Sequence, residues 1–347
     1  MLKRLLKTTL ALLPLFCPTA AQAHVKWFLS KSEAELLAQP KPDLFVHLRW
    51  DNGLVGMLVA ICLYLAHRLN RKLSAHPLNK KLAATAGAFD PYIQLFIGIF
   101  TGLVLLYCAQ NMTFFVPNLH LHSCCKWIAR TEALVGLALI LGLMARPAAA
   151  AMLFLLGFSF LKFPLNDCAD LLPMYGIALY VLIAGRGKFS VDYLIGVAGG
   201  DALPVCEIST AVLRIAVGLG LICLGLDEKL INPQLALNLL QQHPVLNFMH
   251  IFGMSNDLFI LISGFVEVSL GICLTFGIFP RLAITALAGL FCATTLVFGS
   301  SEFIGHMPYY AIFIAVFLRG ANITASAADW RALFAIRRSR RLVAAPY

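Results

Sequence analysis

Apolar residues along this chain gather in long runs separated by short polar segments, and they do not alternate with polar residues as in a half-buried sheet. A helix needs about 20 mostly apolar residues to cross the hydrocarbon core of a bilayer. Runs of this length, or slightly shorter, lie at 53–69, 92–110, 128–144, 147–164, 172–184, 209–226, 258–278, 282–298 and 303–319. The pattern therefore predicts an all-α integral membrane protein with about nine transmembrane helices.

The composition agrees with a chain whose main solvent is lipid. Of the 347 residues, 60% are apolar and only 13% are charged. A soluble protein of this length would need a much larger polar surface, so the soluble globular and disordered classes are excluded. The net charge of +10 is typical of basic cytoplasmic loops in a membrane protein. We therefore expect the lipid bilayer as the main partner and no nucleic acid.

The segment 1–23 has the three parts of a secretory signal peptide. A basic start is followed by an apolar stretch at 9–16 and by the small-residue sequence Ala21-Gln22-Ala23. The alternative is an uncleaved anchor. Cleavage after Ala23 would leave 24–52 as a periplasmic segment that begins with His24. The amine and imidazole of an N-terminal histidine together form a chelate that suits Cu(II).

Basic residues mark one side of the predicted membrane. They follow the first apolar run between Arg68 and Lys72, and they recur as a cluster of arginines in the tail 321–347. Cytoplasmic loops are enriched in Lys and Arg. We therefore expect a multi-pass protein of a bacterial-type inner membrane, with a periplasmic N-terminus after signal cleavage and a basic cytoplasmic tail.

The chain also carries an internal repeat, in which both copies contain the motif Glu-x3-Gly-x5-Gly-x3-Arg. The two motifs begin at Glu132 and Glu267, 135 residues apart. The same offset aligns Pro173 with Pro308, Tyr175 with Tyr310 and Gly185 with Gly320, and an offset of 116 aligns Gly102 with Gly218. Each copy holds four apolar runs, an even number, so the two copies would face the same way across the membrane. This predicts two parallel-duplicated four-helix bundles, preceded by a single extra helix at 53–70.

The repeated segments resemble the DoxX/DoxD family of small membrane proteins. The resemblance rests on "RIAVGLGLICLGLDEKL" and "EVSLGICLTFGIFPR" in the second copy, and on "RTEALVGLALILGLMARPAA" and "GRGKFSVDYL" in the first. It implies two tandem DoxX-like four-helix units, at 91–190 and 209–320. The family also implies an inner-membrane location, and some of its members are associated with quinone-linked sulfur oxidation. The first copy departs from the pattern, because Asn111-Met112-Thr113 replaces Asp227-Glu228-Lys229.

Two glutamates are the first candidates for chemistry. Glu132 and Glu267 should lie one or two turns inside the periplasmic ends of their helices, where a carboxylate is costly unless it is paired or protonated. A ligand-binding role and a structural hydrogen bond between helices both explain them.

A second group of candidates lies near the end of the chain. Glu302 and His306 are four residues apart and would share one helix face. Together with Glu267 and the stretch Asp227, Glu228 and Lys229 they would line a periplasm-facing site. A quinone head group needs a polar partner with an apolar slot behind it, and Tyr310 is one of the aromatic residues that would form this slot. The alternative is an interfacial aromatic belt without a ligand.

Histidine and cysteine form the densest polar cluster on the expected periplasmic side. His120, His122, Cys124 and Cys125 are close in sequence, and together with His24 they are candidate ligands of copper or zinc. An oxidising compartment instead favours a disulfide between Cys168 and Cys124 or Cys125. Thiol–disulfide exchange among the three is a further reading.

Catalytic and nucleotide-binding motifs are missing from the sequence: it contains no phosphate loop, GxGxxG, CxxCH or nucleophile elbow. We therefore expect a non-catalytic or quinone-associated membrane subunit of a periplasm-facing redox system, with a periplasmic or membrane redox protein as partner. Two alternatives stay open: handling or transport of a metal such as copper, and a purely structural subunit. Quinone and copper are thus the candidate cofactors.

Overall fold

The computed structural model describes residues 50–73, 87–197 and 207–320. The expected signal peptide at 1–23, His24 and the tail 321–347 lie outside the described residues.

Helices account for nearly all of the described chain, and one coincides with each of the predicted apolar runs. The longer helices are α4 (Trp50–Leu73), α6 (Asp90–Gln110), α7 (Lys126–Leu141), α8 (Ala145–Gly157), α11 (Leu172–Ala184), α13 (Glu207–Gly225), α14 (Pro233–Gln242), α15 (Asn256–Phe276), α16 (Pro280–Phe298) and α17 (Ser300–Arg319). Short helical turns connect them: η2 (Gly87–Phe89), η3 (Ser123–Cys125), α9 (Ser159–Lys162), α10 (Leu165–Cys168), η4 (Ala169–Leu171), α12 (Val191–Leu194), the π-helix η5 (Leu226–Ile231), η6 (Pro244–Leu246) and η7 (Phe248–Phe252).

A small hairpin corrects the purely helical expectation. Strand β1 (Thr113–Phe114) pairs antiparallel with β2 (Val116–His120), with an irregular register that places Thr113 opposite His120. The chain must reverse direction directly after α6, and Met112 and Phe115 do this with positive φ values of 55° and 58°. Few residues other than glycine adopt this conformation, so neither propensity nor periodicity indicates the turn.

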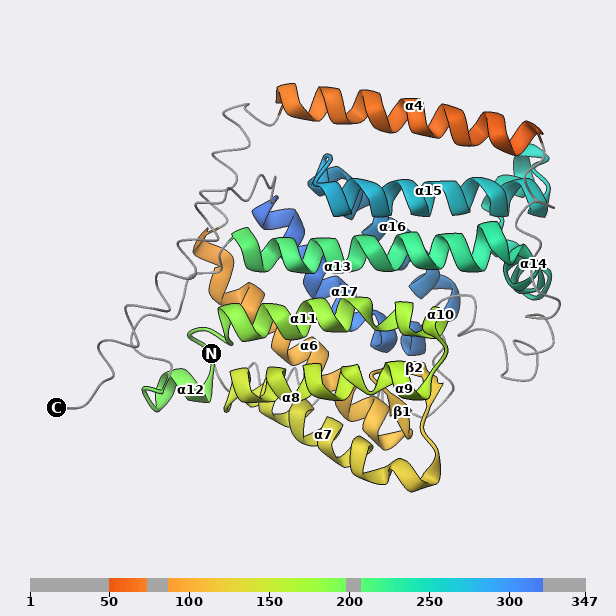
Figure 1. Cartoon of the computed structure of the whole chain (residues 1–347). Coiled ribbons are helices and arrows are strands. Elements are labelled where there is room, and N and C mark those ends of the chain that lie inside the picture. Colours follow the sequence, from red (N-terminus) through yellow and green to blue (C-terminus); the bar gives the residue numbers. More distant parts are fainter. Residues whose placement is uncertain (1–49, 74–86, 198–206, 321–347) are drawn as a thin grey trace.

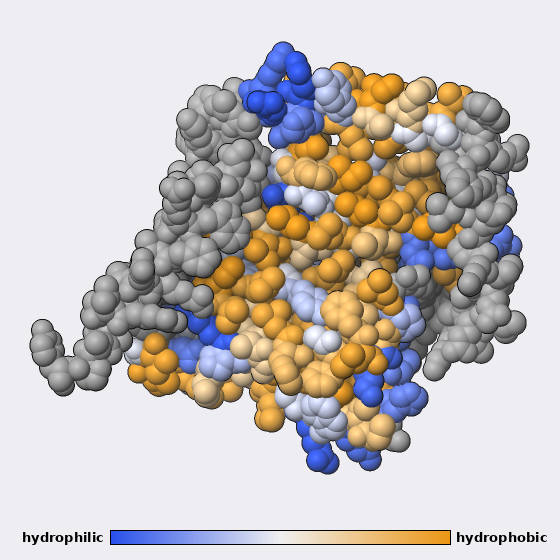
Figure 2. Space-filling view, in the orientation of Figure 1, coloured by the Kyte–Doolittle hydropathy of each residue, from blue (hydrophilic) through white to orange (hydrophobic). Residues whose placement is uncertain are grey.

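Within the described residues, six helical stretches are long and apolar enough to cross a membrane: Gly53–Leu73, Asp90–Gln110, Ala145–Lys162, Ile208–Ile231, Asn256–Phe276 and Pro280–Phe298. A wide apolar band covers most of the visible face, with polar residues towards its ends (Figure 2). Large apolar side chains lie exposed on this surface, among them Leu134, Phe154 and Leu296. These properties support a multi-pass protein with a lipid bilayer around its apolar helices.

The helices form two groups with the same order of neighbours. In the first helix group (α6, α7, α8 and α11), each helix contacts the next and α11 returns to α6. In the second helix group (α13, α15, α16 and α17), the same closed order is found. Between the groups, α11 packs against α13 and α17 packs against α6. Helix α4 stands at one edge of the molecule beside α15 (Figure 1).

Close approach within each group depends on glycine. A Cβ on Gly102 of α6 would lie 2.5 Å from the carbonyl oxygen of Gly136 in α7. A Cβ on Gly218 of α13 would lie 2.7 Å from the carbonyl oxygen of Gly271 in α15. Helices in lipid associate through packing at small residues, so both groups use one glycine pair to bring their first two helices together.

The same sharp turn ends the second helix of each group. Helix α7 stops at Gly142 (φ 63°) and α15 stops at Gly277 (φ 69°), both in the left-handed conformation. Two residues later Met144 and Phe279 are also left-handed, at φ 50° and 44°, and each precedes the next helix. Gly at this position is the usual helix terminator because it lacks a Cβ, whereas the second left-handed residue is apolar in both turns.

Candidate functional site

Buried carboxylates collect at one end of the molecule. Glu132, Asp170, Glu228 and Glu302 are each at most 2% exposed. They lie near the starts of α7, α11 and α17 and at the end of α13, which is the end labelled α10 and β2 in Figure 1. Buried charge is costly unless it is paired or hydrogen-bonded, so the partners of each carboxylate decide what this end of the molecule can do.

Glu302 and His306 face each other in the first turns of α17. The His306 Nδ1 atom is 3.3 Å from Glu302 Oε1, and the two side chains are 4% and 1% exposed. Aromatic rings surround the imidazole: its centroid is 4.1 Å from that of Phe291, 5.8 Å from that of Tyr309 and 6.3 Å from that of Tyr310. The prediction that Glu302 and His306 share one helix face is therefore confirmed, and the surroundings of the two side chains are aromatic.

Tyr310 connects this pair to the outer surface. Its hydroxyl donates to the carbonyl of Phe291 over 3.2 Å and lies 2.8 Å from the Thr295 hydroxyl. Its ring stacks on Phe303, with centroids 5.6 Å apart and an interplanar angle of 28°. Phe303 is 38% exposed. The His306 cage thus has one aromatic wall that faces outward.

A second polar cluster joins the two helix groups. The Asn118 side chain in β2 donates to the Asp170 carboxylate over 2.6 Å. Tyr309, from α17, is fully enclosed, and both Asp170 and Glu228 lie close enough to its hydroxyl to interact electrostatically. Polar side chains from β2, η4, η5 and α17 therefore meet where the groups contact each other, one helical turn from His306.

Glu132 and Glu267 occupy matching places with different partners. The buried carboxylate of Glu132 accepts the backbone N–H of Phe115 over 2.7 Å, and the positive φ of Phe115 aims that N–H at it. Glu267 instead forms an ion pair with Lys229 of η5, and the two side chains are 22% and 17% exposed. Glu132 thus lies in a dry contact with the backbone, and Glu267 lies in a partly solvated ion pair.

The acidic-basic stretch of η5 is divided among three environments. Lys229 binds Glu267, and Glu228 points to the interface near Tyr309. Asp227 accepts the side-chain amide of Asn232 over 3.1 Å. A π-helical turn, which is frequent at functional sites, spreads these consecutive side chains in different directions. Each of the three side chains therefore has a different nearest partner, and a single site that they line with Glu267 and Glu302 stays a prediction.

Arg186 binds the carboxyl end of α7. It follows α11, is 2% exposed, and donates to the carbonyls of Leu139 over 2.6 Å and Ile140 over 3.2 Å. Burial lowers the pKa of Arg186 to about 10, still far above neutral pH, so the guanidinium remains charged. Its path runs over Gly98 of α6, where any side chain would collide with the guanidinium.

Arg214 does the same at the carboxyl end of α15, from a different element. It lies within α13, is 2% exposed, and donates to the carbonyls of Leu274 and Thr275. These two residues follow Leu139 and Ile140 by 135 positions, whereas Arg214 follows Gly98 by 116 positions. In each helix group, therefore, one guanidinium binds the corresponding two carbonyls at the end of the second helix. Sequence reasoning missed the contacts of both arginines, although Arg214, a lone arginine inside an apolar run, signals a special role.

The histidine–cysteine cluster is not assembled as a metal site. No group of three or more His, Cys, Asp or Glu side chains with metal-binding geometry occurs among the described residues. His120 and His122 are exposed beside the hairpin, and His24 lies outside the described residues. The sulfurs of Cys124 and Cys125 are 3.7 Å apart.

The expected disulfide is also not formed. Cys124, Cys125 and Cys168 are all free thiols in the structure. Cys168 lies in α10, and its sulfur contacts the carbonyl of Phe163 at 3.9 Å. Burial raises the pKa of the Cys168 thiol above its ordinary value, which makes a reactive thiolate less accessible at neutral pH.

Comparison with known proteins provides no relative: no family model, no curated protein and no solved structure matches this chain. Function must therefore be argued from the residues of the molecule itself.

Proposed function

We propose that the chain is a DoxX-like membrane protein made of two copies of one four-helix unit, preceded by the helix α4. All nine apolar helices would cross the inner membrane, with α14 and the hairpin on the periplasmic side and the basic segments in the cytoplasm. Residues 1–23 would be removed as a signal peptide. The family assignment rests on the sequence resemblance, and the duplication has additional support from recurring contacts.

These recurring contacts follow the sequence offset atom by atom. The Tyr175 hydroxyl donates to the carbonyl of Leu156, and the Tyr310 hydroxyl donates to that of Phe291, so donor and acceptor are both shifted by 135 residues. Arg146 lies beside Gly185 just as Arg281 lies beside Gly320. Similar composition alone would not reproduce specific hydrogen bonds at one constant offset.

For the function, we propose a non-catalytic, quinone-binding membrane subunit of a periplasm-facing redox system. The observation that carries this proposal is the buried Glu302–His306 pair inside an aromatic cage, with the stacked Phe303 and Tyr310 rings as its outer wall. A quinone head group is flat, amphipathic and carries two carbonyl oxygens. An apolar site with a few polar groups near one edge suits such a ligand.

The chemistry assigned to each group is limited to binding. The ring of the quinone would enter the cage from the lipid side by turning the outer wall of Phe303 and Tyr310 aside, and it would pack against these rings, where offset stacking is favourable. The His306 imidazole, whose Nδ1 atom lies 3.3 Å from Glu302 Oε1, would present its other nitrogen to a quinone oxygen. Loss of the imidazole should weaken binding more than loss of the Tyr310 hydroxyl, because that hydroxyl already bonds to Phe291 and Thr295.

The test is a titration of the detergent-purified full chain with a short-tailed ubiquinone, followed by calorimetry. The unmodified protein should bind at about one equivalent, and His306→Leu should weaken binding at least about fivefold, since a lost hydrogen bond in a dry site costs about 1–3 kcal/mol. Leucine is the natural choice, because Leu171 stands 135 residues before His306.

Tyr175→Phe is the control, since it removes the corresponding tyrosine hydroxyl from the first helix group, which has Leu171 at the position of His306. Its quinone affinity should equal that of the unmodified protein. Absence of binding by the unmodified protein, or equal binding by His306→Leu, would reject the quinone assignment.

A further inference from the structure

A shallow groove of about 380 Å³ lies between the end of α6 and the start of α7, in the first helix group. Its apolar floor and its two cations are Leu106, Ala109, Ala129, Ala133, Lys126 and Arg130. It is separate from the Glu302–His306 cage, which belongs to α17. Quinone binding at the cage therefore does not account for the groove.

Two cations stand at the polar end of a lipid-facing stripe. Lys126 and Arg130 are exposed and one helical turn apart, and Leu134, Leu137 and Leu141 continue the same side of α7 as exposed apolar residues. Like charges at this spacing repel each other. Among the residues that the structure describes, neither cation forms an ion pair or a hydrogen bond through its side chain.

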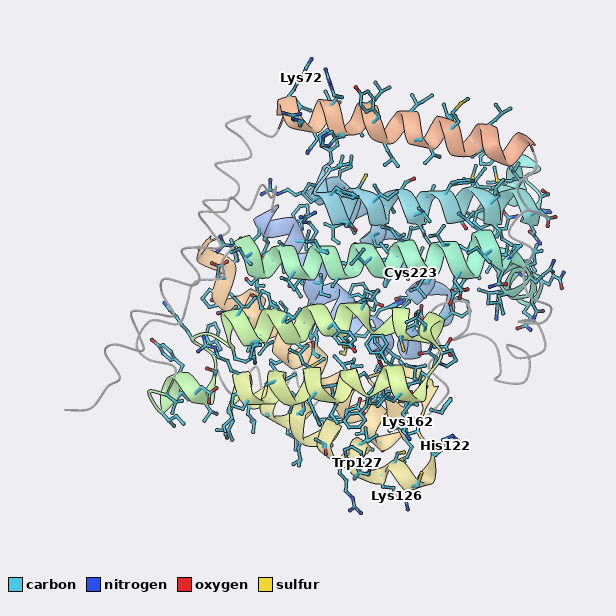
Figure 3. The ribbon with its side chains drawn as sticks, viewed as in Figure 1. Lys72, His122, Lys126, Trp127, Lys162 and Cys223 are labelled. Atoms are coloured by element: carbon cyan, nitrogen blue, oxygen red, sulfur yellow. The ribbon has the colours of Figure 1, made fainter. Side chains whose placement is uncertain are left out.

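A third cation strengthens the positive field at this corner. Lys162, at the end of α9, lies close enough to Cys125 to interact with its thiol electrostatically. Figure 3 shows Lys126, Trp127 and Lys162 at the same end of the molecule, around the start of α7. Trp127 is 49% exposed, as is usual for a tryptophan at the level of lipid head groups.

The fold itself does not require these charges. The residues 135 positions later are Leu261 and Phe265, so the second helix group has apolar residues at the places of Lys126 and Arg130. Beyond the segment 24–52, cations are also scarce in the segments that the proposed orientation places outside the cytoplasm. Two cations without a partner among the described residues, above an apolar groove, are complementary to an anion that carries a hydrocarbon tail.

We propose that this groove is a binding site for an anionic phospholipid of the outer leaflet of the membrane. The lipid phosphate would lie between Lys126 and Arg130, and an acyl chain would follow the apolar floor towards Leu134. Two cations near an anionic lipid, at about 1 kcal/mol each, together contribute about 30-fold in affinity over a zwitterionic lipid. The inference rests on the membrane placement of α7 and does not depend on quinone binding.

The test uses native mass spectrometry of the full chain in detergent with equal amounts of dioleoyl phosphatidylglycerol and dioleoyl phosphatidylcholine. The unmodified protein should retain phosphatidylglycerol in at least about tenfold excess. The double variant Lys126→Leu/Arg130→Phe, which copies the second helix group, should lose this excess. The charge-preserving variant Lys126→Arg/Arg130→Lys should keep it, and size-exclusion profiles should show that both variants are folded.

A matched control removes the same amount of charge elsewhere. Arg68→Leu/Lys72→Leu, on the exposed face of α4 at the opposite end of the molecule (Figure 3), should leave retention unchanged within about twofold. Equal retention of the two lipids by the unmodified protein, or an equal loss in the α4 control, would overturn the site. Displacement of the lipid by millimolar inorganic phosphate would show a simple anion site instead, and would overturn the lipid assignment.

Discussion

The two helix groups share a backbone plan but differ in the side chains that complete it. In the first group a guanidinium reaches the end of α7 from Arg186, after the last helix, whereas in the second group Arg214 reaches the end of α15 from within the first helix. Gly98 marks the place in α6 that corresponds to Arg214, and it is glycine because Arg186 occupies the space above it. Both helix groups thus have a guanidinium at the same helix end, although the arginine that supplies it comes from a different element.

The glutamates show the opposite relation, because the residue is kept and the partner changes. Glu132 binds a backbone N–H from a strained hairpin turn, whereas Glu267 binds the side chain of Lys229. The first arrangement is dry and the second is partly open to solvent. A carboxylate at this depth therefore has a structural use in one group and a more exposed, exchangeable pairing in the other.

The largest expected effect comes from moving the arginine. Arg186→Ala should lower the free energy of unfolding by about 3 kcal/mol, because buried carbonyls at the end of α7 lose a charged donor. Gly98→Arg in the same background would supply a guanidinium from the position that Arg214 uses, and it should recover about half of the loss. Chemical denaturation in detergent micelles measures both changes. If Gly98→Arg/Arg186→Ala is no more stable than Arg186→Ala, the two arginines are not equivalent.

The glutamates should give a smaller and unequal effect. Glu132→Leu leaves the Phe115 N–H without its acceptor in a buried place, which should cost about 2 kcal/mol. Glu267→Leu leaves Lys229 within reach of water, so its cost should stay below about 1 kcal/mol. The same denaturation experiment checks the order, and a larger loss in Glu267→Leu would contradict the distinction between a dry and a solvated site.

The turns after α7 and α15 are a third difference between the helix groups. The backbone N–H groups of the two turns donate to side chains from different elements. The Asp192 carboxylate accepts the Met144 N–H over 2.7 Å. In the other turn Asn70 of α4 accepts the Phe279 N–H over 3.1 Å and donates to the Gly277 carbonyl over 3.2 Å.

Removal of these side chains should affect different regions. Asp192→Ala should cost about 1.5 kcal/mol, and Asn70→Ala about 1 kcal/mol, since the lost bonds are charged in one case and neutral in the other. Only Asn70→Ala should increase hydrogen exchange in α4, which is otherwise largely exposed. Hydrogen exchange measured by mass spectrometry distinguishes the two variants. Unchanged exchange in α4 of Asn70→Ala would show that Asn70 does not anchor this helix.

The smallest expected effect distinguishes a loss of folding stability from a loss of quinone affinity. Tyr175→Phe and Tyr310→Phe remove equivalent hydroxyl–carbonyl bonds, so each should lower the free energy of unfolding by about 1 kcal/mol. Only Tyr310→Phe touches the proposed quinone site, where we expect a two- to threefold weaker affinity. Equal quinone affinities would restrict the binding site to His306 and Glu302.

Periodicity and spacing predict the parts of the structure that depend on neighbours within one helix. The helix positions follow from the apolar runs, and the pairing of Glu302 with His306 follows from their four-residue spacing. Contacts between helices depend on rotation and depth, which one sequence does not encode locally. The ion pair of Lys229 with Glu267 and the approach of Asp170 to Tyr309 are therefore visible only in three dimensions.

The expected disulfide failed for a related reason. Oxidising surroundings make a disulfide favourable, but the bond also requires the two Cβ atoms to lie about 3.5–4.5 Å apart. Cys168 is fixed in α10, whereas Cys124 and Cys125 belong to η3 beside the start of α7. An oxidising compartment therefore permits a disulfide, but the fold decides which cysteines lie close enough to form one.

The contacts between the helix groups, α11 with α13 and α17 with α6, use the last helix of each group and the first helix of the other. Two separate four-helix proteins would meet in this way as a symmetric dimer. When both groups belong to one chain, their association is intramolecular, and the linker between them gives an effective concentration in the millimolar range. The interface is then no longer required to be the same on both sides, and one side has the salt bridge between Arg319 and Asp90. Covalent linkage thus allows each half to specialise without losing its partner.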